Sequence, residues 1–202
     1  MVKVLKAVLL FLFGFAMLEV LAQEDFSVKK RGIVPDYLNM QFAGNIGSGS
    51  IGAGYYLNPS RTLFFDAVYG YSPAFRSGRA IHNIVVRLVA KPYSLNLKKQ
   101  YSLKPLLSIA VSKQIADDDR TFSRLPKNFP EGYYAPNAFR LHFDLGLALR
   151  KDIDKSGIIK AVEFYANTTT NEMYVTYFIR SQSVNLGDIF SLTLGFNLYL
   201  FE

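Results

Sequence analysis

The chain has 202 residues, of which half are apolar and 19% are charged, a composition that excludes an intrinsically disordered protein and indicates one compact domain. It contains 13 Tyr and 17 Phe but no Cys, which excludes disulfide scaffolds, thiolate metal centres and cysteine nucleophiles. The formal charge is +7, but the basic residues are scattered rather than clustered, so we expect no nucleic-acid partner.

Residues 1–22 are expected to form a secretory signal peptide. Lys3 and Lys6 give a positively charged start, and Ala7–Leu18 is a run of twelve uncharged residues. This run is too short to cross a bilayer as a helix, which needs about 20 residues. We therefore expect an exported chain whose mature domain covers residues 23–202.

The mature chain alternates apolar and polar residues with period two, which predicts strands rather than helices. The clearest strand covers Phe139–Arg150, where every odd position is Phe or Leu, and Phe190–Phe201 repeats the pattern. Weaker alternation predicts six further strands, over 38–46, 51–57, 63–71, 84–90, 107–112 and 162–167. Eight strands of this kind predict an all-β fold, an antiparallel up-and-down transmembrane β-barrel.

The predicted connections alternate in length, as they do in a barrel with long outer loops and short periplasmic turns. The longest covers residues 114–137, whereas the next covers only 151–157. One segment leaves the strand count open, because Met173–Arg180 also alternates and could extend the seventh strand or form an extra one. An extra strand would require a tenth, for which Phe26–Val34 is the candidate, so ten strands are the alternative to eight.

Alternation alone does not say which face of each strand lies inside the barrel. A soluble lipocalin-like barrel encloses its apolar face around a ligand, whereas a membrane barrel turns that face to lipid. The polar faces carry charges of both signs that could neutralise one another in a closed interior: Asp66, Arg87, Arg140, Asp144, Arg150 and Glu163. The apolar faces of the two clearest strands also run for about the height of the ~25 Å lipid-facing band. We therefore expect a membrane barrel, with a soluble secreted lipocalin-like barrel as an alternative.

These features resemble the small outer-membrane β-barrel proteins of Gram-negative bacteria, a group that includes the OmpX and OmpA-barrel types and the lipid A deacylase barrel. The resemblance is carried by the signal peptide, the eight strands and the closing segment Leu194–Phe201, whose final aromatic residue is typical, although Glu202 follows it. It implies a monomer in the bacterial outer membrane, delivered by the outer-membrane assembly machinery and surrounded by outer-membrane lipid and lipopolysaccharide. Because the resemblance is architectural, it assigns no functional residues.

Two sets of residues are candidate sites. Charges in a narrow lumen must be paired, so we expect an interior polar network of Asp66, Arg87, Arg140, His142, Asp144 and Glu163. Basic and aromatic residues of the longest loop are candidates for contact with lipopolysaccharide phosphates: Arg120, Arg124, Lys127, Tyr133 and Tyr134.

No motif indicates a cofactor, a metal site or catalysis. A G-x-G-x-x-G pattern over 47–52 precedes a predicted strand rather than the helix that a dinucleotide site needs. The deacylase barrel carries His-x-Ser-Asn on a late strand, but residues 163–171 contain neither His nor Ser, so a Ser–His–acid set could form only across the barrel. We expect a non-enzymatic protein with a structural or surface-interaction role and no wide pore, and a lipid A- or phospholipid-modifying enzyme is the alternative.

Overall fold

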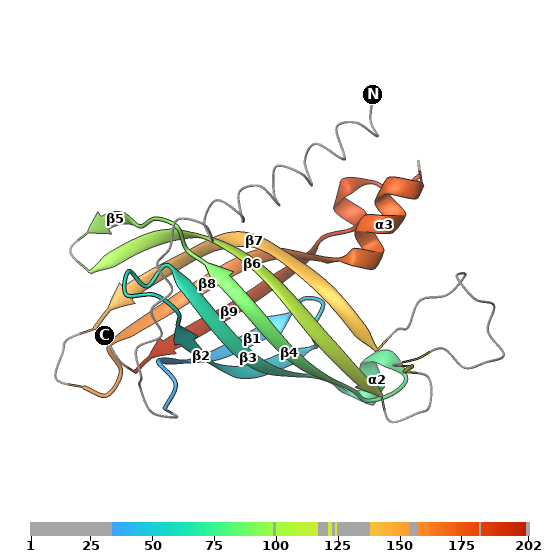
Figure 1. Cartoon of the computed structure of the whole chain (residues 1–202), viewed down its shortest axis with the longest axis horizontal. Coiled ribbons are helices and arrows are strands. Elements are labelled where there is room, and N and C mark those ends of the chain that lie inside the picture. The colour runs from blue at the N-terminus through green and yellow to red at the C-terminus, as the bar shows by residue number, and fades with distance from the viewer. Residues whose placement is uncertain are drawn as a thin grey trace.

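The computed structural model describes residues 34–98, 100–116, 121–122, 124, 138–153, 157–181 and 183–200. Its main feature is a closed antiparallel barrel of eight strands (Figure 1). These strands are β1 (Tyr37–Ala43), β2 (Gly49–Tyr56), β3 (Leu63–Ser72), β4 (Ile81–Ala90), β6 (Tyr101–Ala116), β7 (Phe139–Asp152), β8 (Ala161–Asn171) and β9 (Ser191–Tyr199). The ring closes between β1 and β9, where Tyr37 lies opposite Tyr199. The predicted up-and-down barrel and its eight strands are confirmed.

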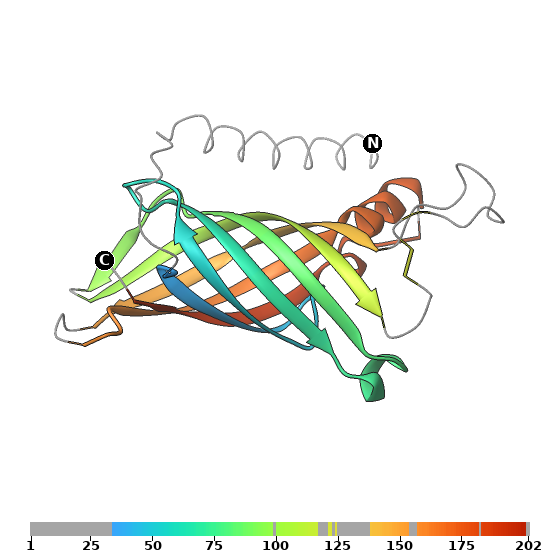
Figure 2. The ribbon, with the colours of Figure 1, turned by 60° about the horizontal axis from the view of Figure 1, so that its bottom comes forward.

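The connections distinguish the two ends of the barrel, as Figure 2 also shows. One end, here called the α3 end, carries the connections 44–48, 73–80, 117–138 and 172–190, including α2 (Ala74–Ser77), α3 (Glu172–Arg180) and the 3-10 turn η1 (Leu186–Asp188). The other, here called the β5 end, carries the connections 57–62, 91–100 and 153–160 and the short strand β5 (Leu95–Lys98).

The β5 strand lengthens one side of the barrel wall. Leu95 pairs with Leu103 near the start of β6, whereas the last residue of β4, Ala90, pairs with Leu107 further along β6. The edge of β6 therefore has two successive partners, and the β5–β6 hairpin extends beyond β4 at this end (Figure 1). The strand β5 was not predicted, because residues 92–101 lie between the strands expected over 84–90 and 107–112.

The segment Met173–Arg180 is helical, so its interpretation as a strand is wrong, and with it the ten-stranded alternative. Asn171 caps α3 by accepting a hydrogen bond from the Tyr174 amide at 3.0 Å, with Glu172 in the first turn and Arg180 in the last. A strand over these residues would turn aromatic or aliphatic side chains to both faces, which a polar lumen does not accept. The possible tenth strand over Phe26–Val34 falls on residues outside the described ranges, except for Val34, which is not in a strand.

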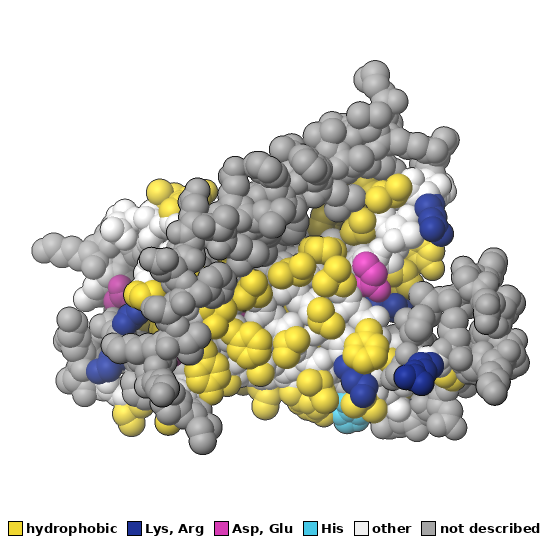
Figure 3. Space-filling model, viewed as in Figure 1, with side chains coloured by type: hydrophobic (Ala, Val, Ile, Leu, Met, Phe, Trp, Pro, Cys, Tyr) yellow, Lys and Arg dark blue, Asp and Glu magenta, His cyan; other side chains and the backbone are white. Residues whose placement is uncertain are grey.

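The barrel is polar inside and apolar outside. On β7, Asp144 is 8% exposed and its neighbour Leu145 is 50% exposed, which confirms the face predicted for each. Other outward side chains are large and apolar, among them Leu38, Phe42, Ile51, Ile84, Leu147, Phe164 and Leu192. Figure 3 shows hydrophobic side chains over the outside of the barrel, with Lys and Arg toward the two ends in this view. No helix within the described ranges is long and apolar enough to cross a membrane.

Aromatic rings fill the interior toward the β5 end. Tyr37, Phe64 and Tyr199 are at most 2% exposed, and the ring centroids of Tyr37 and Tyr199 lie 5.1 Å apart. Two inward-facing glycines make room for such rings, because a Cβ at Gly54 would overlap the Tyr37 ring and one at Gly195 would overlap the Tyr165 ring. Glycine is therefore required at both positions by close packing.

Candidate functional site

The centre of the lumen holds a buried salt bridge between neighbouring strands. Asp66 of β3 lies opposite Arg87 of β4, and Arg87 Nη2 donates to Asp66 Oδ2 at 2.7 Å while its Nε donates to the same oxygen at 2.9 Å. The other carboxylate oxygen accepts a hydrogen bond from the hydroxyl of Tyr37. Both charged side chains are at most 7% exposed, so the pair is desolvated and its two members depend on each other.

A second buried salt bridge lies nearer the β5 end and crosses the lumen. Lys91, just after β4, donates to Glu163 Oε1 of β8 and, at 3.0 Å, to the hydroxyl of Tyr199. Tyr199 donates in turn to Glu163 at 3.1 Å, and Asn197 Nδ2 donates to it at 2.8 Å. The Lys91 ammonium also lies 4.5 Å from the centroid of the Phe64 ring, which adds a cation–π contact.

Side-chain amides and one tyrosine connect the two salt bridges. Arg87 Nη1 donates to Gln41 Oε1 at 3.0 Å, and the Tyr165 hydroxyl donates to the same oxygen at 3.1 Å. Asn39 Nδ2 donates to the Tyr165 hydroxyl at 3.0 Å and to Asn197 Oδ1 at 2.6 Å. Asp66, Arg87 and Glu163 therefore belong to one hydrogen-bonded network with members on β1, β3, β4, β8 and β9.

The other three residues of the predicted network lie successively closer to the α3 end, each with a partner of its own. Asp144 accepts a hydrogen bond from Ser108, and His142 Nε2 lies 2.7 Å from the Ser112 hydroxyl. Arg140 lies at the start of β7, where its Nη1 donates to Glu172 Oε1 of α3 at 3.2 Å. The structure therefore brings Arg140 to an element that the sequence analysis had not connected with the lumen.

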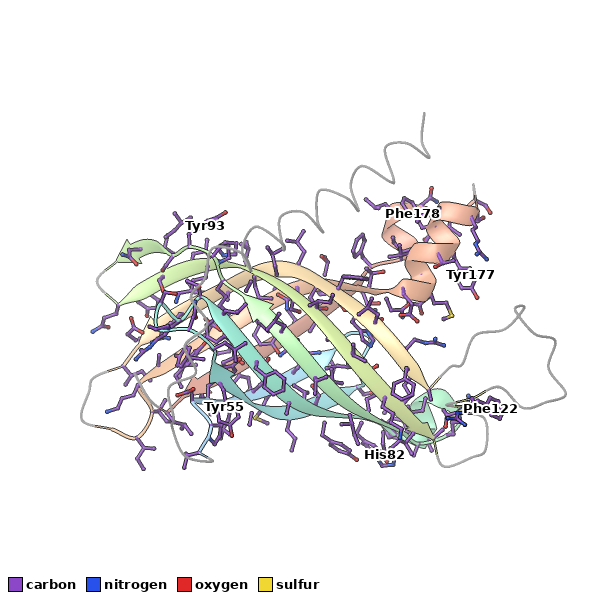
Figure 4. All side chains as sticks on the ribbon, in the orientation of Figure 1. Tyr55, His82, Tyr93, Phe122, Tyr177 and Phe178 are labelled. Carbon is purple, nitrogen blue, oxygen red and sulfur yellow. The ribbon has the colours of Figure 1, made fainter. Side chains whose placement is uncertain are left out.

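Ser112 and His142 are at hydrogen-bond distance, as a nucleophile and its base would be. Within the described ranges, however, His142 Nδ1 has no hydrogen-bond partner, and the nearest acid on its strand, Asp144, binds Ser108 instead. Ser112 and His142 are at most 1% exposed and point into the lumen, so a substrate at the outer surface of the barrel could not reach them. The second histidine, His82, lies on the outside of β4, where its Nδ1 is 2.5 Å from the Tyr69 hydroxyl (Figure 4).

The lumen around the central network is nearly full. The cavity that borders Asp66, Arg87, Lys91 and Tyr165 measures about 10 Å³, room for no more than about one water molecule. Larger pockets lie at the two mouths: one of about 420 Å³ at the α3 end and one of about 600 Å³ at the β5 end. The centre of the barrel therefore separates two mouths rather than joining them.

Of the predicted outer-loop contacts, Arg124 alone lies within the described ranges, and it is exposed. Arg120, Lys127, Tyr133 and Tyr134 lie outside those ranges. Across the described ranges, no three His, Asp or Glu side chains are grouped so that they could hold a metal ion.

The sequence analysis missed several members of the network, including Lys91, Tyr37, Gln41 and Tyr199. The signal for Lys91 was present, because it continues the alternation that turns every second residue of β4 inward, but it follows the predicted end of the strand at Ala90. The tyrosines were missed because an aromatic ring gives no indication by itself that it will fill a polar lumen. No protein-family model, curated protein or solved structure matches the chain, so its function has to be inferred from this geometry.

Proposed function

We propose that the chain is an integral outer-membrane β-barrel protein with a structural or surface-interaction role, and that it does not form a wide pore. The observation that carries this proposal is the inverted polarity of the barrel, with salt bridges and amides inside and large apolar side chains outside. Soluble monomers rarely expose contiguous apolar surfaces of more than a few hundred Å². An apolar surface that runs around the outside of a barrel is stable in a lipid bilayer.

The length of the strands supports the same placement. Strand β7 has 14 residues, which at a rise of about 3.4 Å per residue and a tilt of roughly 40° span about 35 Å of membrane height. The lipid-facing band of such barrels is about 25 Å tall. In this placement the α3 end, with the longer connections, faces the cell exterior, and the β5 end faces the periplasm.

The soluble lipocalin-like alternative is not supported, because a barrel of that kind needs an apolar interior for its ligand. Here the central cavity is about 10 Å³ and is bordered by charged and amide side chains. The alternative of a lipid-modifying enzyme is also not supported, because the Ser112–His142 pair points into the lumen and away from the apolar outer surface.

The proposal is tested by expressing the full chain in a Gram-negative bacterium, washing the separated membranes with concentrated salt and with alkaline carbonate, and comparing unboiled with boiled samples by electrophoresis. We expect the protein to stay in the outer-membrane fraction and to migrate differently before and after boiling, because a closed barrel resists unfolding by detergent. Recovery in the soluble periplasmic fraction would contradict the proposal.

A further inference from the structure

The pocket at the β5 end is lined by cations from three separate elements. Arg61 lies in the β2–β3 turn, Lys104 on β6 and Arg150 on β7, and all three border one pocket of about 600 Å³. Among the described residues a single carboxylate, that of Asp152, also lines it. The described lining therefore has two positive charges in excess, whereas the neighbouring Lys91 and Glu163 neutralise each other.

Lys104 is a cation of this lining without an anion in direct contact. It alternates with the buried Ser102 and Leu106 in the inward-facing row of β6 and is half-buried. Within the described ranges it has neither a carboxylate at salt-bridge distance nor a hydrogen-bond acceptor. A half-buried ammonium group is unfavourable without an anion, so this position favours one supplied from outside the lumen.

Arg61 is held in place at a cost to the backbone. Its φ angle is +57°, in the left-handed region that disfavours an L-residue with a side chain. Asn58 fixes this turn by accepting hydrogen bonds from the amides of Thr62 and Leu63 at 3.1 and 3.0 Å. The guanidinium of Arg61 lies 5.0 Å from the centroid of the Tyr56 ring, at the edge of the pocket.

Arg150 is oriented from two sides. Its Nε donates to Asp152 at 2.7 Å, and its guanidinium lies 4.5 Å from the centroid of the Tyr199 ring. Neutral donors such as Ser60, Ser102 and Asn96 complete the lining, so the pocket combines positive charge with several hydrogen-bond donors. An anionic group with several acceptor oxygens matches both features, and a phosphate group fits a guanidinium and an ammonium group side by side.

We propose that the mouth of the barrel at the β5 end binds a phosphate group, presented either by a small soluble phosphate ester or by the headgroup of a phospholipid. The site is additional to the proposed function, and its binding in solution does not depend on the membrane placement of the barrel. In the proposed orientation the site opens to the periplasm.

The test uses the full chain, folded in a non-ionic detergent, in isothermal titration calorimetry with inorganic phosphate and with glycerol 3-phosphate. We expect Lys104→Gln to weaken binding roughly tenfold or more, the effect of losing one charge-assisted hydrogen bond. The control is Lys113→Gln, which removes the same charge from an exposed residue on the outside of the α3 end. Arg61→Gly is a second variant, which we expect to weaken binding while raising the thermal stability, because glycine adopts this φ angle without strain.

A second experiment identifies the source of the phosphate group. The detergent-folded chain is diluted into phosphatidylcholine vesicles prepared with or without phosphatidylglycerol, and binding is measured by co-sedimentation. Binding to glycerol 3-phosphate that depends on Lys104 supports a soluble ligand, and Lys104-dependent binding to the phosphatidylglycerol vesicles alone supports a headgroup. Binding in neither experiment, or an equal loss in Lys104→Gln and Lys113→Gln, would overturn the proposal.

Discussion

The charged side chains of the lumen are residues whose single replacement is expected to destabilise this barrel strongly. Asp66 and Arg87 are each desolvated, and each satisfies the other together with Tyr37 and Gln41. Removing one member of such a buried pair leaves an unpaired charge, which costs more than the pair contributes. A sequence can predict which residues face inward, but it cannot predict that Gln41 and Tyr165 connect the two salt bridges, because that depends on side chains that meet across the lumen.

We expect Arg87→Met to destabilise the folded barrel by about 3–5 kcal/mol, because it leaves Asp66 buried and unpaired. The double variant Arg87→Met with Asp66→Asn should recover a large part of this loss, since no charge remains. Equilibrium unfolding in urea of both single variants and the double variant measures the coupling. Additive effects would show that the two side chains do not form the pair described.

On the outer face, we expect Leu145→Arg to cost about 2–4 kcal/mol of folding free energy in a bilayer, because the residue lies midway along β7. The matched control is Ile153→Arg, just beyond the end of β7, for which about 0–1 kcal/mol is expected. Folding into phospholipid vesicles at a series of urea concentrations gives both values. A loss for Leu145→Arg no larger than that for Ile153→Arg would contradict a lipid-facing position.

At the scale of elements, the eight strands were predictable, but the full length of β6 and the additions to the barrel were not. Strand β7 alternates over its whole predicted length, so its register on both neighbours follows from which face is buried. Helix α3 was mistaken for a strand because its residues are β-branched and aromatic types that also favour strands. The helix is stabilised by the cap from Asn171 and by the contact of Glu172 with β7. Neither interaction can be inferred from a period-two pattern.

Glu172 is the residue that fastens α3 to the barrel, since its carboxylate accepts from Arg140 at 3.2 Å and from the Leu141 amide at 2.8 Å. We expect Glu172→Ala to speed amide hydrogen exchange across α3 by about 5- to 30-fold while leaving the exchange of β7 and β8 unchanged, because the loss is about 1–2 kcal/mol and local. Hydrogen-exchange mass spectrometry measures both regions. Arg180→Ala at the far end of the helix is the control, and an equal effect of the two variants would exclude an anchoring role for Glu172.

For the whole molecule, the closed eight-stranded barrel follows from the number and length of the alternating segments, whatever residues fill the lumen. The blocked centre does not follow from the count of strands alone, because it depends on two tyrosine rings that pack over Gly54 and Gly195. The pocket at the β5 end was also beyond prediction, since the β5–β6 extension that forms one of its walls lies between two predicted strands.

We expect no stepwise ion conductance from the folded chain in planar lipid bilayers, because the cavity at the centre of the lumen measures only about 10 Å³. A double variant that removes the two tyrosine rings nearest the blockage, Tyr37→Ala with Tyr165→Ala, should admit small ions if it folds, which circular dichroism would establish. Steady conductance from the unaltered protein would contradict the description of the lumen.

The ring closure between β1 and β9 has a consequence for the route by which this chain acquires its structure. Lys91 and Glu163 are 72 positions apart and meet only across the lumen, and Asn39 and Asn197 are 158 positions apart and meet only at the closing seam. A half-assembled sheet would therefore present unpaired charges and two open edges at once. Such long sequence separations make folding slow and cooperative, with the lumen charges satisfied only as the ring closes. The chain stays open until its first and last strands can pair, and during that time its unpaired edges make it most vulnerable to aggregation and proteolysis.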